Sequence, residues 1–124
     1  MKRLPPERQQ ELIQKVRELG PRFAERAAKY DRDASFPYEN YEDLREIGFL
    51  GLAIPESYGG LGADLATYSL IAEEIGRYCG STALTFNMHT ATCLFTGPIA
   101  DDLDWTDEQR KQLEDRRERL YRGI

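Results

Sequence analysis

Apolar residues recur at helical spacing through the first quarter of the chain. The positions concerned are Leu12, Ile13, Val16, Leu19, Phe23, Ala24, Ala27, Ala28 and Tyr30. Apolar side chains three or four positions apart lie on one face of a helix, and a first turn tolerates prolines such as Pro5-Pro6. Because the spacing continues across Gly20-Pro21, we expect one long helix that bends there and ends near residues 31–33.

A second, shorter helix is predicted where Phe36-Pro37 places a proline in the first turn. Its apolar stripe consists of Tyr41, Leu44 and Ile47. Gly48 would end this helix. The next apolar stretch, residues 49–55, is too short and too interrupted for a helix, so we expect buried, extended chain. Three glycines at positions 59, 60 and 62 then predict a turn with positive φ angles or close backbone contacts.

A third helix is predicted to follow Asp64, which is a suitable N-cap residue. Its apolar positions are Leu65, Tyr68, Ile71, Ala72, Ile75 and Tyr78. Gly80 would end it. Glu73 and Glu74 are adjacent, and neighbours on a helix point about 100° apart, so they do not form a paired acid–base site. We expect both carboxylates to face solvent.

The fourth predicted helix, residues 82–95, contains no Asp, Glu, Lys or Arg. Ser81 would cap it, and Gly97-Pro98 would end it. A helix without a charged face is typically buried on several sides. We therefore expect this helix at the centre of the domain or against another domain.

A last helix is predicted over residues 107–122. Its acid-to-base pairs at i,i+4 are Asp107 with Lys111, Asp115 with Arg119, and Glu118 with Arg122. Its thin apolar stripe consists of Leu113, Leu120 and Tyr121. No segment alternates like a strand, so the predicted class is all-α, an orthogonal or up-down bundle of four to five helices.

Composition narrows the functional classes. With 124 residues, the chain has the length of one domain, and its charged share of 31% indicates a soluble protein. The net charge of -5 argues against nucleic-acid or anionic-membrane partners. Two cysteines without metal-ligand spacing predict neither a disulfide framework nor a metal site. Without a targeting or membrane-spanning segment, we expect a cytoplasmic protein.

No complete catalytic group is visible in the residues themselves. The glycine-rich turn lacks the Gly-Lys-Ser/Thr ending or the preceding strand that a phosphate-binding loop needs, so a structural turn is favoured. His89 and Cys93 lie four positions apart, but no orienting group or oxyanion donor accompanies them. We interpret His89 as a hydrogen-bonded interior or interface residue. The acidic stretch from Asp101 to Glu108 lacks calcium-loop spacing and leads into a helix N-terminus.

Two segments nevertheless form a distinctive sequence motif. The first is Phe36-Pro37, followed by Leu44-Arg45-Glu46-Ile47-Gly48-Phe49-Leu50-Gly51-Leu52 and Ile54-Pro55-Glu56-Ser57-Tyr58-Gly59-Gly60-Leu61-Gly62. The second is Glu73-Glu74-Ile75. In this order and spacing, the motif resembles the N-terminal domain of acyl-CoA dehydrogenases. The resemblance covers roughly residues 12–99, residues 101–105 look like an insertion, and residues 106–110 are similar to the start of the family's next helix.

The resemblance implies a flavoenzyme that removes an α-proton from an acyl-CoA thioester and transfers a β-hydride to FAD. The family has a helical, a β and a second helical domain, and its catalytic glutamate lies in the last of these. We therefore expect residues 1–124 to form the N-terminal α-helical domain alone, with no catalytic residue and no FAD bound by this chain in isolation. The isolated chain is expected to be inactive.

The resemblance also implies that the family's acyl pocket lies against the fourth helix. The matching positions are Ala83, Leu84, Asn87, Met88 and Ala91. Packing against another domain is an equally open interpretation of these residues. Asn87 stands where an acidic residue can occur in the family, so acyl chain length and branching stay open.

Two functional hypotheses follow. In the first, the chain supplies one wall of an acyl-CoA pocket and part of an interdomain interface. In the second, it is a stand-alone helical interaction module that forms a homo-oligomer through the same surface. The resemblance does not separate dehydrogenases from the related oxidases and flavin-dependent monooxygenases.

Overall fold

A computed structural model describes all of residues 1–124 and contains helices but no strands. Five helices have nine or more residues: α1 (Pro6–Asp33), α2 (Tyr38–Glu46), α3 (Leu65–Gly76), α4 (Gly80–Thr96) and α6 (Asp107–Tyr121). A single turn, α5 (Pro98–Asp101), follows α4, and two 3₁₀ turns, η1 (Phe49–Gly51) and η2 (Glu56–Tyr58), lie between α2 and α3. The all-α prediction is confirmed. No helix has both the length and the apolar character needed to cross a membrane.

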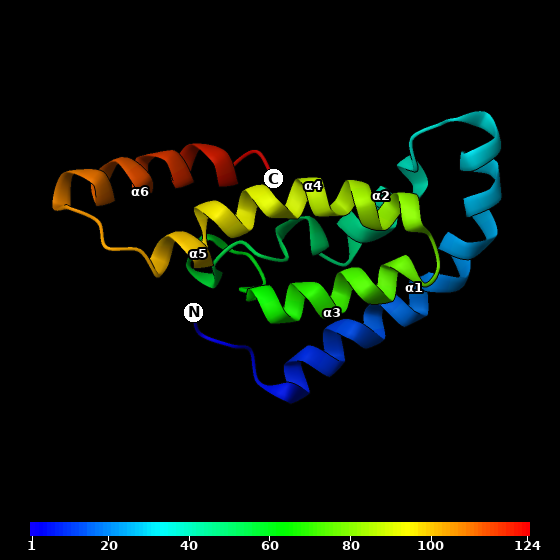
Figure 1. The fold of residues 1–124 in the computed structure, drawn as a ribbon, viewed down its shortest axis with the longest axis horizontal. Helices are drawn as coiled ribbons and strands as arrows, with labels where there is room; N and C mark the ends of the chain where they lie inside the picture. Colours follow the sequence, from blue (N-terminus) through cyan, green and yellow to red (C-terminus); the bar gives the residue numbers. More distant parts are fainter.

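Helix α1 is continuous through Gly20 and Pro21, as the periodicity predicts. Pro21 lacks the N–H that would donate to the carbonyl of Arg17, and loss of this bond is a common cause of helix bending. Figure 1 shows the axis of α1 changing direction about midway along the helix. The bend lets one helix follow both α3 and α2.

The segment between α2 and α3 differs from the prediction. Residues 49–55 are buried in part, but they form short turns instead of extended chain. Gly51 O, Leu52 O and Ile54 O accept hydrogen bonds from the backbone N–H groups of residues 61, 63 and 62, respectively. The chain therefore doubles back on itself, and this pairing satisfies backbone groups that a short apolar run cannot satisfy locally.

Helix boundaries near α4 also differ. Asp64 caps α3 as predicted, accepting a hydrogen bond from Thr67 N at 3.1 Å. However, α3 ends at Gly76, and Gly80 begins α4 instead of ending α3. Cys79 occupies the N-cap position that was predicted for Ser81.

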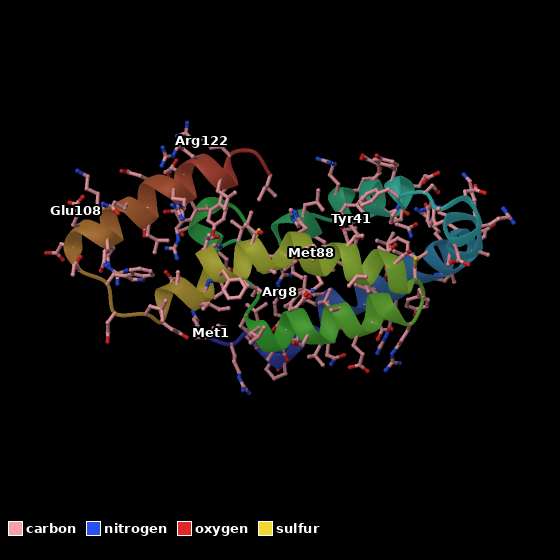
Figure 2. All side chains as sticks on the ribbon, turned by 45° about the horizontal axis from the view of Figure 1, so that its top comes forward. Met1, Arg8, Tyr41, Met88, Glu108 and Arg122 are labelled. Atoms are coloured by element: carbon pink, nitrogen blue, oxygen red, sulfur yellow. The ribbon has the colours of Figure 1, made fainter.

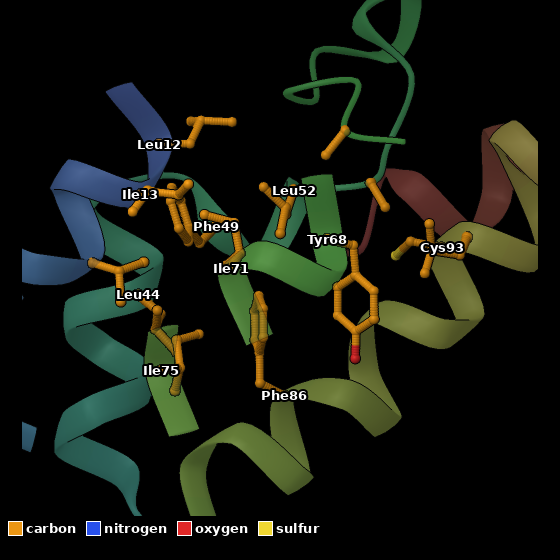
Figure 3. Packing of buried hydrophobic residues seen from close by; sticks show 14 of the residues in the cluster. Leu12, Ile13, Leu44, Phe49, Leu52, Tyr68, Ile71, Ile75, Phe86 and Cys93 are labelled. Atoms are coloured by element: carbon orange, nitrogen blue, oxygen red, sulfur yellow. The ribbon is translucent and has the colours of Figure 1, made fainter. Parts of the chain in front are cut away.

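One apolar core joins the helices. Nineteen buried residues form a single cluster, to which α1, α3 and α4 all contribute. Phe23, Phe49 and Phe86 are among its largest fully buried side chains. Figure 3 shows Phe49, Ile71 and Phe86 pointing toward the centre of this cluster. Helix α3 packs against both α1 and α4 and so fixes their relative positions.

A buried polar network links α1, α2 and α4. Arg26 Nη1 donates to Asn40 Oδ1 at 3.0 Å and to Asp43 Oδ2 at 2.7 Å. Asn40 Nδ2 in turn donates to Thr82 Oγ1 of α4 at 2.9 Å. Asn40 and Thr82 are fully buried, so these bonds satisfy groups that water cannot reach.

Helix α6 runs back beside the C-terminal half of α4, at the end of the molecule away from the α1–α2 turn (Figure 1). Arg117 Nε donates to Thr96 O at 2.6 Å, and the hydroxyls of Tyr121 and Thr96 lie 3.0 Å apart. Of the three predicted ion pairs on α6, only Glu118 with Arg122 is within bonding distance, at 3.1 Å. The other two stay apart because exposed, flexible side chains gain little from pairing in water.

Asp64 gives the fold a predictable dependence on pH. Burial alone would raise the pKa of Asp64, but hydrogen bonds from Leu4 N, Thr67 N and the Thr67 hydroxyl lower it below the usual value. A lowered folded-state pKa contributes stability that is present above about pH 4 and is lost as the pH falls through the folded value. Asp64→Asn should therefore destabilise the chain by about 1–2 kcal/mol at pH 7.

Urea unfolding of both proteins at pH 7 and pH 3 tests this expectation. The difference in unfolding free energy should shrink at pH 3, where protonation of Asp64 weakens the same bonds in the unsubstituted chain. A difference that is equal at the two pH values would contradict the assignment.

Candidate functional site

Helix α4 has two faces of opposite environment. Its core face consists of Thr82, Phe86, Thr90, Cys93 and Leu94, which are all buried. Opposite them lie Leu84, Met88 and Phe95, which are 66%, 70% and 68% exposed. Met88 is labelled on α4 in Figure 2. The prediction of a helix buried on several sides is thus correct for the core face only, because these three side chains remain uncovered.

The outer face of α4, defined by Leu84, Met88 and Phe95, carries no charge, since α4 has no Asp, Glu, Lys or Arg. Isolated exposed apolar residues are ordinary on protein surfaces, but here three large ones lie along one helix face. Such strips typically mark a surface that another molecule or domain covers. The outer face is therefore the first candidate for a binding surface.

Of the five predicted pocket residues, Leu84 and Met88 belong to the outer face, while Ala83 and Asn87 lie toward α3. Leu84, Asn87 and Met88 are exposed, while Ala83 and Ala91 are half-buried. Three cavities, of about 410, 220 and 470 Å³, are lined by residues other than these five. These residues therefore form at most one wall, and a pocket here requires a second surface to close it.

Asn87 is the one predicted residue held by a side-chain hydrogen bond. The hydroxyl of Tyr68, on α3, donates to Asn87 Oδ1. Tyr68 is 8% exposed, and burial raises the pKa of its hydroxyl above the ordinary value, at which the group is already protonated at neutral pH. Sequence reasoning missed Tyr68 because its spacing marks only a core position, whereas its hydroxyl reaches a neighbouring helix.

His89 and Cys93 do not form a reactive pair. The ring nitrogen Nε2 of His89 donates to the backbone oxygen of Leu50 at 2.7 Å. Cys93 is buried, and burial raises the pKa of its thiol, which disfavours the thiolate that acts as a nucleophile. The sequence predicts a hydrogen-bonded interior or interface residue at His89, and the structure shows a half-buried side chain whose hydrogen bond links α4 to η1.

The adjacent residues Glu73 and Glu74 lie in different environments. Glu73 faces solvent and pairs with Arg77 at 3.1 Å, as predicted. The prediction for Glu74 is wrong: its side chain is buried, and its Oε1 accepts a hydrogen bond from Arg17 Nε at 3.2 Å. The cation on α1 makes burial of this carboxylate tolerable. The contact spans 57 positions in sequence and therefore leaves no local pattern.

The glycine-rich turn is structural, and it fits neither a phosphate nor a flavin diphosphate. The backbone N–H groups of Gly60, Leu61 and Gly62 all donate to carbonyl oxygens of residues 51–55. An anion cradle needs N–H groups that are free to meet the anion.

The acidic stretch before α6 forms structural ion pairs. Asp101 Oδ1 lies 2.7 Å from Arg117 Nη2, and Asp102 lies 2.7 Å from the amino group of Met1. Arg117 is buried within a helix that is otherwise mostly charged and exposed. Sequence reasoning missed this residue because nothing in its local pattern distinguishes it from its neighbour Arg116. No cluster of three or more His, Cys, Asp or Glu side chains could hold a metal ion.

Comparison with known families gives one match over most of the chain. The family model described as "Acyl-CoA dehydrogenase, N-terminal domain" matches residues 6–113. A probable acyl-CoA dehydrogenase, YngJ, of Bacillus subtilis is 38% identical over 78 residues, which cover 59% of this chain and 20% of that protein. The mitochondrial short-chain specific acyl-CoA dehydrogenase of Mus musculus is 36% identical over 112 residues, which cover 86% of this chain and 25% of that protein.

Among solved structures, the chain is similar to KijD3, crystallised in complex with dTDP. The two share a TM-score of 0.70 and 31% sequence identity, over 77% of this chain and 24% of that one. The chain thus spans about a quarter of the length of the proteins that it matches.

Proposed function

Because the chain belongs to the acyl-CoA dehydrogenase family through its N-terminal domain, we propose that the outer face of α4 forms one wall of an acyl-CoA pocket. The parent activity would be the α,β-dehydrogenation of acyl-CoA thioesters with FAD as the hydride acceptor. No residue of this chain is assigned to catalysis or to the flavin. Its contribution is the wall formed by Ala83, Leu84, Asn87, Met88 and Ala91, together with an interdomain interface.

The observation that carries this proposal is the exposed, charge-free outer face of α4. Covering Leu84, Met88 and Phe95 with an alkyl chain or an apolar domain surface would stabilise the assembly by about 1–2 kcal/mol per side chain. A charge on such a wall would have to be desolvated by the same covering, which is costly. The absence of charge over all of α4 therefore supports an apolar occupant.

The wall would also shape the reaction indirectly. Excluding water strengthens electrostatic interactions within a closed site, and an apolar wall contacts an alkyl chain without leaving a polar group of the wall unpaired. The buried network at Thr82 and the His89–Leu50 bond keep α4 in place while its outer face is in contact with the occupant. The chain thus supplies orientation and exclusion of solvent.

A chimera tests the proposed wall. Residues 6–113 would replace the matching segment of the Mus musculus short-chain enzyme, and reduction of its flavin by acyl-CoA would be followed. We expect Leu84→Glu to lower kcat/KM at least tenfold, equivalent to about 1.4 kcal/mol, because a carboxylate on the wall must be desolvated.

Leu103→Glu is the matched control. Leu103 is 51% exposed and lies between α5 and α6, so the same change there places no charge on α4. Flavin content and thermal unfolding of each variant show whether the chimera has folded. Equal kcat/KM for the Leu84 and Leu103 variants would refute the wall.

A further inference from the structure

Asn87 is a polar side chain whose orientation is fixed on an otherwise apolar wall. Its Oδ1 accepts the hydrogen bond from the Tyr68 hydroxyl. Because an amide group is planar, engaging Oδ1 also sets the direction of the two Nδ2 hydrogens. No protein group accepts a hydrogen bond from Nδ2 in the structure, and Asn87 is exposed. A pair of oriented donors is thus available on the outer side of α4.

These donors need an acceptor once the wall is covered. In the free chain, water can satisfy Nδ2, but a bound apolar group would displace that water and leave the donors unpaired. An unpaired buried donor typically lowers affinity about tenfold or more. Sites built around such a donor reject analogues that lack the matching acceptor.

The charges nearby favour an uncharged acceptor. Helix α4 carries no cation, and the charged residues of α3 are Glu73 and Glu74. A carboxylate placed at Asn87 would therefore meet one neutral donor group and no opposite charge, which does not compensate for its lost hydration.

We infer that Asn87, positioned by Tyr68, selects acyl thioesters whose acyl chain carries an uncharged oxygen acceptor, such as an ether, hydroxyl or keto oxygen. The inference rests on the proposed wall and names the class of substrate that the wall would take. Asn87 acts as the specificity-determining residue, and Tyr68 acts through it as a positioning residue.

Paired substrates in the chimera test this inference. Each pair consists of an all-carbon acyl-CoA and one of equal length in which an ether oxygen replaces a methylene beyond the two reacting carbons. Scanning the oxygen along the chain should reveal a position at which Asn87→Leu shifts the kcat/KM ratio at least tenfold toward the all-carbon substrate. Tyr68→Phe keeps the buried ring but frees the amide to rotate, and should shift the same ratio about threefold.

The outcomes separate this inference from the proposed function. An unchanged ratio in Asn87→Leu, with activity still lost in Leu84→Glu, would overturn the selection of an oxygen and leave the wall standing. If Leu84→Glu keeps its activity and Asn87→Leu leaves the kcat/KM ratio unchanged, both the wall and the selection of an oxygen are refuted. A third substrate with a terminal carboxylate tests the charge argument: if Asn87→Leu reduces its kcat/KM more than that of the ether, the preference for an uncharged oxygen is wrong.

The 124-residue chain itself provides a second readout. In isotope-labelled protein, the side-chain amide resonances of Asn87 should move in Tyr68→Phe, because the hydrogen bond to Oδ1 is lost. Resonances that do not move would overturn the positioning role of Tyr68. General loss of stability would not mimic this result, since the shift is measured in folded protein and at one side chain.

Discussion

Gly60→Ala should destabilise the fold by about 3 kcal/mol, among the largest effects expected of a single methyl group. A Cβ at this position would overlap both the carbonyl oxygen and the Cβ of Ile54. Neither atom can move away easily, because Ile54 is buried and its carbonyl accepts the hydrogen bond from Gly62 N at 2.9 Å. The strain would fall on the doubled-back segment between α2 and α3.

Urea unfolding with Gly80→Ala as the control would measure this effect. A Cβ on Gly80 meets no atom within 4 Å, and Gly80 lies in the first turn of α4. That variant should stay within about 0.5 kcal/mol of the unsubstituted chain or gain slightly, because alanine favours helix. Equal stability of the two variants would show that the segment relaxes around the added methyl group.

Arg117→Met should release α6 from the rest of the molecule. The guanidinium is 4% exposed and donates to Thr96 O at 2.6 Å and to Gly97 O at 3.0 Å. Methionine retains much of the aliphatic volume but leaves Thr96 O without this donor, while Gly97 O keeps the hydrogen bond from Asp101 N at 3.0 Å. An unpaired carbonyl costs about 1–3 kcal/mol if it stays buried, and the ion pair between Arg117 and Asp101 is lost as well. We therefore expect a loss of about 3 kcal/mol, relieved in part by undocking of α6.

Hydrogen exchange locates this loss. Backbone amides of α6 should exchange faster in Arg117→Met than in the unsubstituted chain, while those of α3 change less, because α3 packs against both α1 and α4 whereas α6 reaches the core only at its C-terminal end. Arg116→Met is the control, since Arg116 is the exposed neighbour on the same helix. Acceleration confined to α3, or none at all, would show that Arg117 does not hold α6.

Local patterns predicted most of the elements correctly. The spacing of apolar residues correctly predicted that α1 continues past Pro21, because the buried stripe is present on both sides of the proline. Residues 49–55 were assigned wrongly because a short apolar run is compatible with several buried conformations. What decides between them is the pairing with residues 61–63, and a local window does not reveal this pairing.

The sequence predicted the composition of the candidate site but not which side of α4 faces outward. The absence of charge along α4 is visible in the sequence, whereas the exposure of Leu84 and Met88 depends on where the other helices pack. Glu74, Arg117 and Tyr68 went unrecognised for a related reason. Each is defined by a partner 16 or more positions away, and side chains at that separation follow no helical period.

The polar contacts of α4 determine its rotation about its own axis. Apolar packing alone is compatible with small rotations, since Phe86 and Leu94 would find new neighbours at modest cost. The bonds to Thr82, His89 and Thr96 are directional, and they occur near the start, middle and end of the helix. One residue step on a helix is about 100°, so a slip of that size would turn Leu84 and Met88 away from the outer face. These three bonds therefore fix the rotation of α4 and, with it, the side chains that the helix exposes on its outer face.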